Sequence, residues 1–135
     1  MSLVFLDTNI LVYTLADGDP RQVIAEALLA QGFVLSVQVL NEFVNVARRK
    51  LKLSWPDIAM ALSVFRKFAS KPAPVTIATH EAGLELADRY GFRFYDSLII
   101  ASALELGCTT LMTEDMQDGQ VIGGRLTLRN PFTRS

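Results

Sequence analysis

Three aspartates stand where the chain leaves a predicted strand or enters a predicted helix. Asp7 directly follows the apolar run 3–6, and Asp115 comes two residues after the run 109–113. Asp96 lies where a loop becomes a helix. In open parallel sheets, ligands bind at the carboxyl ends of the strands. Carboxylates gathered at such an edge can hold a divalent cation, because Mg²⁺ takes oxygen ligands.

Two of these aspartates also have an ordinary structural explanation. Asp96 can simply cap the N-terminus of its helix, and Asp115 can simply stabilise a turn, which are the commoner uses of aspartate at such positions. Asp7 is different, because a carboxylate directly after a buried strand costs free energy unless it has a partner. A functional explanation is therefore favoured for Asp7 by itself, and for the other two when all are considered together.

Glu42 is a fourth candidate, and the sequence alone does not place it near the others. It lies in VLNEFVNVARRKL, whose apolar stripe consists of Leu40, Phe43, Val44, Ala47 and Leu51. On a helical wheel Glu42 points well away from the centre of that stripe, so it is equally explained as a solvent-facing charge. Only a fold or a resemblance can bring it to the aspartates.

The elements that must position these acids alternate along the chain. Apolar and β-branched runs predict strands at 3–6, 33–37, 75–78, 109–113 and 126–128. Helical spacing predicts helices over 21–32, 39–53, 56–70, 80–91 and 95–107, the last of them buried, with Asp96 or Ser97 at its start. Strands separated by helices predict an α/β sandwich with a mainly parallel sheet.

Length and composition limit the class of protein. The 135 residues, half of them hydrophobic, predict a single domain over 1–135. The net charge of −1 gives no global basic field, so an anionic partner must be met locally. The single Cys108 fits a reducing cytoplasm, and the sequence shows neither a membrane-length apolar run nor a secretion signal. We expect a cytoplasmic protein without a membrane partner.

Four short motifs resemble those of the PIN-domain nucleases, in the same order. They are LDTNIL at the start, NEF after the second predicted strand, YDSLIIASALELG late in the chain and LMTED after the following strand. The resemblance spans Leu6 to Asp115 and implies a PIN-like three-layer α/β/α sandwich. The PIN-domain family includes the VapC-type toxins, which cut RNA and are held inactive by a cognate antitoxin.

The resemblance also implies the site residues. The family's acidic quartet, which holds the metal and is catalytic, falls on Asp7, Glu42, Asp96 and Asp115. Thr113 matches its small hydroxyl residue and Asn9 the third residue of DTN, and we assign both to orienting ligands or a water. One departure is the acid-rich stretch TEDMQDG, in which Glu114 or Asp118 can join or replace Asp115 as a ligand.

The function implied is a metal-dependent endoribonuclease that uses Mg²⁺ or Mn²⁺, as the toxin of a toxin–antitoxin pair. The alternatives are a housekeeping nuclease for RNA processing, a nuclease acting on single-stranded DNA, and a non-catalytic PIN-like module that binds metal or nucleic acid. Other hydrolases fit poorly, because Asn9 stands where a haloacid-dehalogenase-type phosphatase needs an aspartate and because the lone His80 has no nucleophile elbow near it.

Two surfaces are candidates for partners. Seven of the 13 basic residues fall in one predicted helical pair and can contact RNA phosphates, or form only a solvated face: Arg48, Arg49, Lys50, Lys52, Arg66, Lys67 and Lys71. Apolar surface around Met60 and Val64 exceeds what one core contact uses. Broad core packing explains it, but the resemblance favours an interface for a homodimer or an antitoxin.

Overall fold

The structure is a computed structural model that describes residues 2–133. Its helices are α1 Thr8–Tyr13, α2 Arg21–Ala30, α3 Val37–Arg49, α4 Trp55–Phe68, α5 Ile77–Tyr90 and α6 Phe94–Glu105. Its strands are β1 Val4–Leu6, β2 Thr110–Met112, β3 Val121–Ile122 and β4 Leu126–Arg129.

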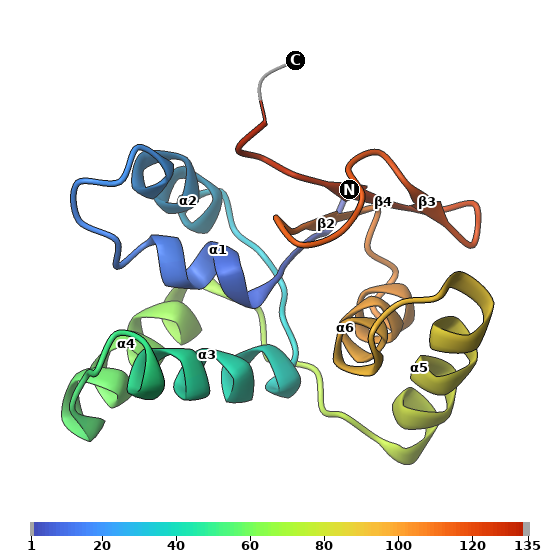
Figure 1. Ribbon diagram of the computed structural model, residues 1–135, viewed down its shortest axis with the longest axis horizontal. Helices are drawn as coiled ribbons and strands as arrows, with labels where there is room; N and C mark the ends of the chain where they lie inside the picture. The colour runs from blue at the N-terminus through green and yellow to red at the C-terminus, as the bar shows by residue number, and fades with distance from the viewer. Residues whose placement is uncertain (1, 134–135) are drawn as a thin grey trace.

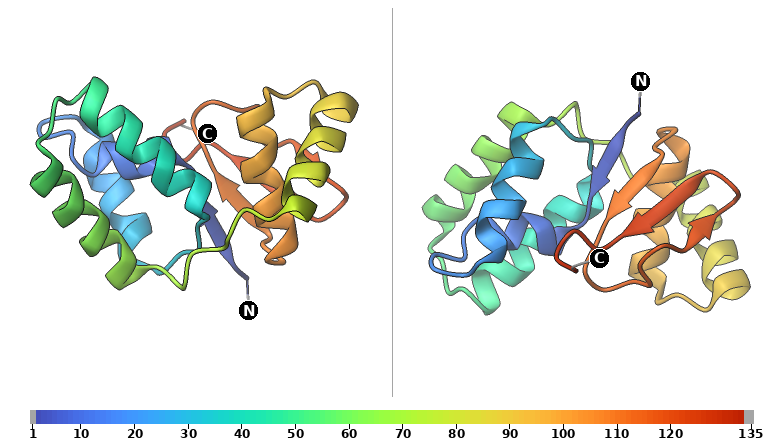
Figure 2. Two further views of the ribbon diagram at one scale, coloured as in Figure 1. Left: turned by 90° about the horizontal axis from the view of Figure 1, so that it is seen from below. Right: turned by 90° about the horizontal axis from the view of Figure 1, so that it is seen from above.

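The four strands form one sheet in the order β1-β2-β4-β3. β1 pairs with β2 and β2 with β4 in parallel, whereas β3 pairs with β4 antiparallel. Helices α1 to α4 lie on one side of the sheet and α5 and α6 on the other (Figures 1 and 2). The expected α/β/α sandwich with a mainly parallel sheet is confirmed.

The register of β1 and β2 brings two site segments together. Leu6 pairs with Met112, so the residues that follow, Asp7 and Thr113, leave the sheet side by side. The amide of Asp7 donates to the carbonyl of Met112 at 3.0 Å, which extends the pairing by one residue. The two segments are 106 residues apart in sequence, and the parallel pairing makes them neighbours.

The predicted strand 33–37 is only partly formed. Val34 makes an isolated parallel bridge to Phe5, supported by a 2.9 Å hydrogen bond from its amide to the carbonyl of Val4. This extended segment then ends at Ser36, whose side chain accepts from the amide of Val39 and caps α3. The capping side chain explains how the chain passes from extended backbone to helix without a breaker.

Helix α6 forms the centre of the core on its side of the sheet, as predicted. The seven consecutive residues 97–103 are all buried. On the opposite side of the sheet from α6, the rings of Phe43 on α3 and Phe65 on α4 meet edge to face with centroids 4.9 Å apart. Such contacts fix helix packing, because edge-to-face pairs stabilise beyond the area they bury.

The predicted strand 75–78 is wrong. Ile77 is the first residue of α5, and Thr76 caps it in a reciprocal capping box with Thr79. The two threonines look β-forming by propensity, but their hydroxyls satisfy the free amides of a helix start. At the other end of α5, Gly91 is left-handed at φ 78°, the predicted C-cap.

Within residues 2–133, no helix is both long and apolar enough to span a bilayer.

Candidate active site

Asp7 leaves β1 and becomes the N-cap of α1, a short helix that the sequence analysis did not predict. Its side chain is only 3% exposed. Oδ1 accepts from the amide of Thr8 at 2.6 Å and Oδ2 accepts from Oγ1 of Thr113 at 2.8 Å. The pKa of Asp7 is raised to about 6: burial is the main cause, both hydrogen bonds oppose it, and the charges of Asp96 and Asp115 add to it.

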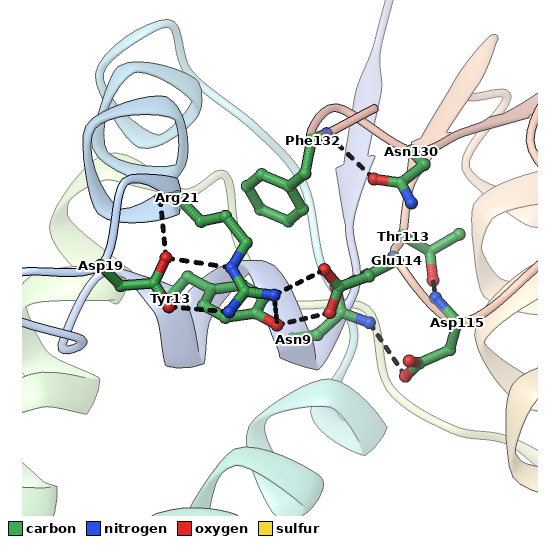
Figure 3. A network of polar contacts seen from close by, with 9 residues as sticks. All are labelled: Asn9, Tyr13, Asp19, Arg21, Thr113, Glu114, Asp115, Asn130 and Phe132. Atoms are coloured by element: carbon green, nitrogen blue, oxygen red, sulfur yellow. Dashed lines mark hydrogen bonds and ion pairs between the residues drawn. The ribbon is translucent and has the colours of Figure 1, made fainter. Parts of the chain in front are cut away.

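Asp115 is held in place by hydrogen bonds with Thr113 and Asn9 (Figure 3). Its amide donates to Oγ1 of Thr113 at 3.2 Å, and its Oδ2 accepts from Nδ2 of Asn9 at 3.0 Å. The other side of the Asn9 amide accepts from the backbone amide of Glu114 at 3.2 Å. The two residues assigned to orientation thus both make hydrogen bonds with the aspartates that they were expected to orient.

Glu42 faces the same acids from α3, where it is half-buried. Its pKa is raised to about 7, mainly by burial, then by the charge of Asp7 and to a smaller extent by the charges of Asp96 and Asp115. Gln38, one turn earlier, donates to its Oε2 at 3.4 Å. The helical wheel left Glu42 open as a solvent-facing charge. In the structure α3 packs against α1, and Glu42 is half-buried and close enough to Asp7 for the two charges to interact.

Asp96 lies in the first turn of α6, not at its cap. The helix begins at Phe94 and its N-cap is Arg93, which makes no side-chain capping bond. The expectation that Asp96 or Ser97 starts the helix is therefore wrong. Burial raises the pKa of Asp96, the ion pair with Nε of Arg93 at 3.6 Å opposes this, and Asp115 raises it again.

The four acids act on one another electrostatically although they come from four separate segments. Burial and like charge raise the pKa of Asp7, Glu42 and Asp96 together, which is the expected result when carboxylates share a site without a cation. Their chemistry fits a hard divalent ion, which binds oxygen ligands and would offset this repulsion. Within residues 2–133, however, no three acidic, histidine or cysteine side chains already stand close enough to hold one.

The other two acids of the TEDMQDG stretch are engaged elsewhere. Glu114 makes an ion pair with Nη1 of Arg21 at 3.1 Å. Asp118 accepts from the amide of Asn130 at 2.9 Å and so joins the loop before β3 to the residue that follows β4. Of the three acids in this stretch, Asp115 is the one whose carboxylate is bonded to Asn9.

The predicted basic cluster is split between the two ends of the α3–α4 pair. Arg48 lies 4.7 Å from the ring of Trp55 at the start of α4, which places residues 48–52 where the two helices connect. Ala69, just after α4, bridges to Phe33 near the start of α3, so the second basic group lies at the opposite end. Only residues 48–52 remain a compact cluster.

The apolar surface expected near Met60 and Val64 is one wall of a groove of about 850 Å³. Its other wall comes from the end of α1 and from α2, including Leu15 and Leu29. Met60 is 68% exposed and Phe68 51%. Large apolar surfaces are seldom left exposed to water unless they bind a partner, so this groove is a candidate binding site.

The fold and the cluster of acids define a small α/β protein with an acidic site at the carboxyl ends of the parallel strands β1 and β2. The chain belongs to the PIN domain family, whose model matches residues 4–117. The matched span includes all four acids together with Asn9 and Thr113. Among curated proteins no sequence matches significantly.

Solved structures share this fold. It is similar to the Mycobacterium tuberculosis toxin VapC20, which cleaves the sarcin–ricin loop, with a TM-score of 0.69 and 20% identity over 83% of this chain and 89% of that one. A toxin–antitoxin complex from Klebsiella pneumoniae has a TM-score of 0.69 and 23% identity, covering 97% of this chain and 98% of that one. VapBC2 from Rickettsia felis, bound to a promoter DNA fragment, has a TM-score of 0.66 and 22% identity over 95% and 99%.

Proposed function

We propose that this protein is a metal-dependent endoribonuclease whose site consists of Asp7, Glu42, Asp96 and Asp115. The observation that carries the proposal is Asp7, a buried carboxylate at the carboxyl end of β1. Its ionised form is destabilised by burial and by the charges of the nearby acids Asp96 and Asp115. Such an arrangement costs stability in the free protein. A function that needs the charge explains why it is there.

The protein's own groups have distinct roles in this proposal. The acids would hold Mg²⁺ or Mn²⁺ through their carboxylate oxygens, and Asn9 and Thr113 keep Asp115 and Asp7 in place. Glu42, half-buried on α3 and within the electrostatic reach of Asp7, is suited to take a proton from an attacking water. When bound, the ion supplies a water of lowered pKa and positive charge for the phosphoryl oxygens.

We further propose that the nuclease is the toxin of a toxin–antitoxin pair. The support is the fold shared with a VapC toxin over 83% of this chain and with a toxin–antitoxin complex over 97% of it. The groove between α2 and α4 has the size and apolar lining that suit an amphipathic antitoxin helix, and Glu26 and Asp57 on its wall favour a basic partner segment. We also expect the toxin to form a homodimer, which sedimentation of the purified chain tests.

Expression in a bacterial host separates the toxin from a housekeeping nuclease. We expect induction of the wild-type chain to arrest growth and to leave newly cut RNA ends, and Asp96→Asn to relieve both. Co-expression of the small protein encoded beside the natural gene should restore growth. Normal growth together with RNA cleavage in vitro would favour the housekeeping role, and cleavage of single-stranded DNA in preference to RNA would overturn the ribonuclease.

A further inference from the structure

A polar network at one side of the acidic site is not used by the four acids themselves. Arg21, the first residue of α2, donates from Nη1 to Oε2 of Glu114 at 3.1 Å and to the hydroxyl of Tyr13 at 2.7 Å. It also holds Asp19 through Nε at 3.0 Å and Nη2 at 2.8 Å. The guanidinium lies 4.2 Å from the centre of the Tyr13 ring (Figure 3).

Glu114 is the point where this network meets the site. Its second carboxylate oxygen accepts from the hydroxyl of Tyr13, so both oxygens are held by groups from α1 and α2. Its backbone amide donates to Asn9, whose Nδ2 donates to Asp115. Phe132 packs edge-on against Tyr13 with ring centroids 5.0 Å apart, which supports the tyrosine from the C-terminal segment.

Asp115 needs such support because of its place in the chain. It lies in the loop after β2, a strand of only three residues, and Asn9 is the side-chain partner of its carboxylate among the described residues. Loops of this kind are more mobile than the elements they connect. A ligand held by one hydrogen bond samples several orientations unless its neighbours are fixed.

We infer that Arg21 and Tyr13 are positioning residues that hold Glu114, and through it keep Asp115 directed toward Asp7. This inference rests on the proposed function. The charge-assisted bonds of Arg21 are partly exposed, its side chain being 41% accessible, so their direct contribution to stability is small. Their effect is on geometry, because a ligand displaced by a fraction of an ångström binds a metal less well.

The test compares Arg21→Gln and Tyr13→Phe with the matched control Tyr90→Phe. Tyr90 also bears a hydroxyl that accepts a hydrogen bond, from the amide of Gly123, on the other side of the molecule. In the metal-free protein we expect the NMR signals of the Asp115 amide and the Asn9 side-chain amide to shift and lose exchange protection in the two test variants only. Titration calorimetry should show Mg²⁺ binding roughly tenfold weaker, with the KM for RNA unchanged.

A double-variant cycle establishes that Arg21 acts through Glu114. In a Glu114→Ala background, Arg21→Gln should cause no further loss of Mg²⁺ affinity. With Glu114 present, Arg21→Lys should retain part of the wild-type affinity, because lysine keeps the positive charge but lacks the several fixed donors of the guanidinium. An undiminished effect in that background, or a raised KM for RNA at saturating Mg²⁺, would mean direct contact with phosphate and overturn the inference.

The NMR arm separates this inference from the proposed function. Shifted Asp115 signals in a protein that neither binds Mg²⁺ nor cuts RNA would support the positioning role and refute the nuclease. Unchanged Asp115 signals and unchanged Mg²⁺ affinity in an active nuclease would refute the positioning role alone.

Discussion

Oγ1 of Thr113 donates a 2.8 Å hydrogen bond to Oδ2 of Asp7, joining the carboxyl ends of β1 and β2. Both residues are almost fully buried. The groups that donate to the Asp7 carboxylate, this hydroxyl and a backbone amide, are both neutral. The negative charge is therefore accommodated by dipoles alone, while nearby acids oppose it.

Metal-free protein should lose stability as the pH rises. Since the pKa values of Asp7 and Glu42 are raised to about 6 and about 7, the folded chain binds more protons than the unfolded chain up to about pH 7. Between about pH 4 and 7 the free energy of unfolding should fall, by about 1–3 kcal/mol from Asp7. Urea unfolding in EDTA at pH 5 and pH 8 measures this, and equal stability at both would contradict it.

Asp7→Asn should remove the share of that pH dependence that Asp7 contributes, leaving the share of Glu42, without weakening the metal-free fold. The amide has no charge to desolvate and can still cap α1. We expect a stability at pH 8 equal to the wild type or up to about 2 kcal/mol higher, and no added stability from Mg²⁺. Asp118→Asn is the matched control, since it removes an exposed acid whose carboxylate accepts a hydrogen bond from the amide of Asn130. A large loss of metal-free stability in Asp7→Asn would argue that the carboxylate is structural.

Thr113→Val should destabilise the fold in a pH-dependent way. Valine keeps the shape but removes the donor, so the ionised form of Asp7 loses a partner and its pKa rises further. The loss should be about 1 kcal/mol greater at pH 8 than at pH 5, with Thr113→Ser close to the wild type. A loss of the same size at both values would show that Thr113 acts through packing only.

The cluster at 48–52 should contribute to RNA affinity without affecting the chemical step. Arg49 follows Glu42 by two helical turns, about 10 Å along α3, so it can meet a phosphate beyond the cleaved bond. Changing Arg49 and Lys50 to Gln should raise the KM for RNA and reduce the salt dependence of binding by about 1–2 ions, at constant kcat. The control is the same change at Arg66 and Lys67, which lie at the opposite end of α4. Equal effects from both pairs would indicate only general charge attraction.

The groove variant Met60→Glu should abolish antitoxin binding while leaving RNA cleavage intact. The substitution places a charge on one apolar wall, whereas Leu84→Glu changes a 60% exposed leucine on α5 outside the groove. Pull-down with the purified antitoxin and cleavage of the same RNA provide the two readouts. Unimpaired binding by Met60→Glu would place the antitoxin on another surface.

Strands β1, β2 and β4 and most helices could be predicted because their apolar patterns are local, whereas the two-residue β3 was not predicted. The segment 75–78 could not be predicted, since its residues favour a strand individually and become a helix start through the hydroxyls of Thr76 and Thr79. The spacing of those two threonines was the available signal. The six-residue α1 was also missed, because it is too short to show a periodic stripe and Asp7 was considered as a ligand but not as its cap.

The site was predictable only as far as the motifs reached. The order of the motifs selected the four acids, but the wheel for Glu42 describes one helix and cannot show that α3 packs against α1. Arg21 gave no signal in the sequence. Its partner Asp19 lies two positions away and its partner Glu114 lies 93 positions away, so no local pattern joins the three residues. Relationships of this kind arise from the fold and not from local pattern.

The most direct test is cleavage of end-labelled RNA by metal-stripped protein, with Mg²⁺ or Mn²⁺ added in steps, using the wild type, Asp7→Asn and Asp118→Asn. We predict cleavage by the wild type and by Asp118→Asn that rises with metal and saturates as calorimetric binding does, and none by Asp7→Asn. Cleavage that persists in EDTA, or that Asp7→Asn retains, would contradict the account of a four-acid metal site.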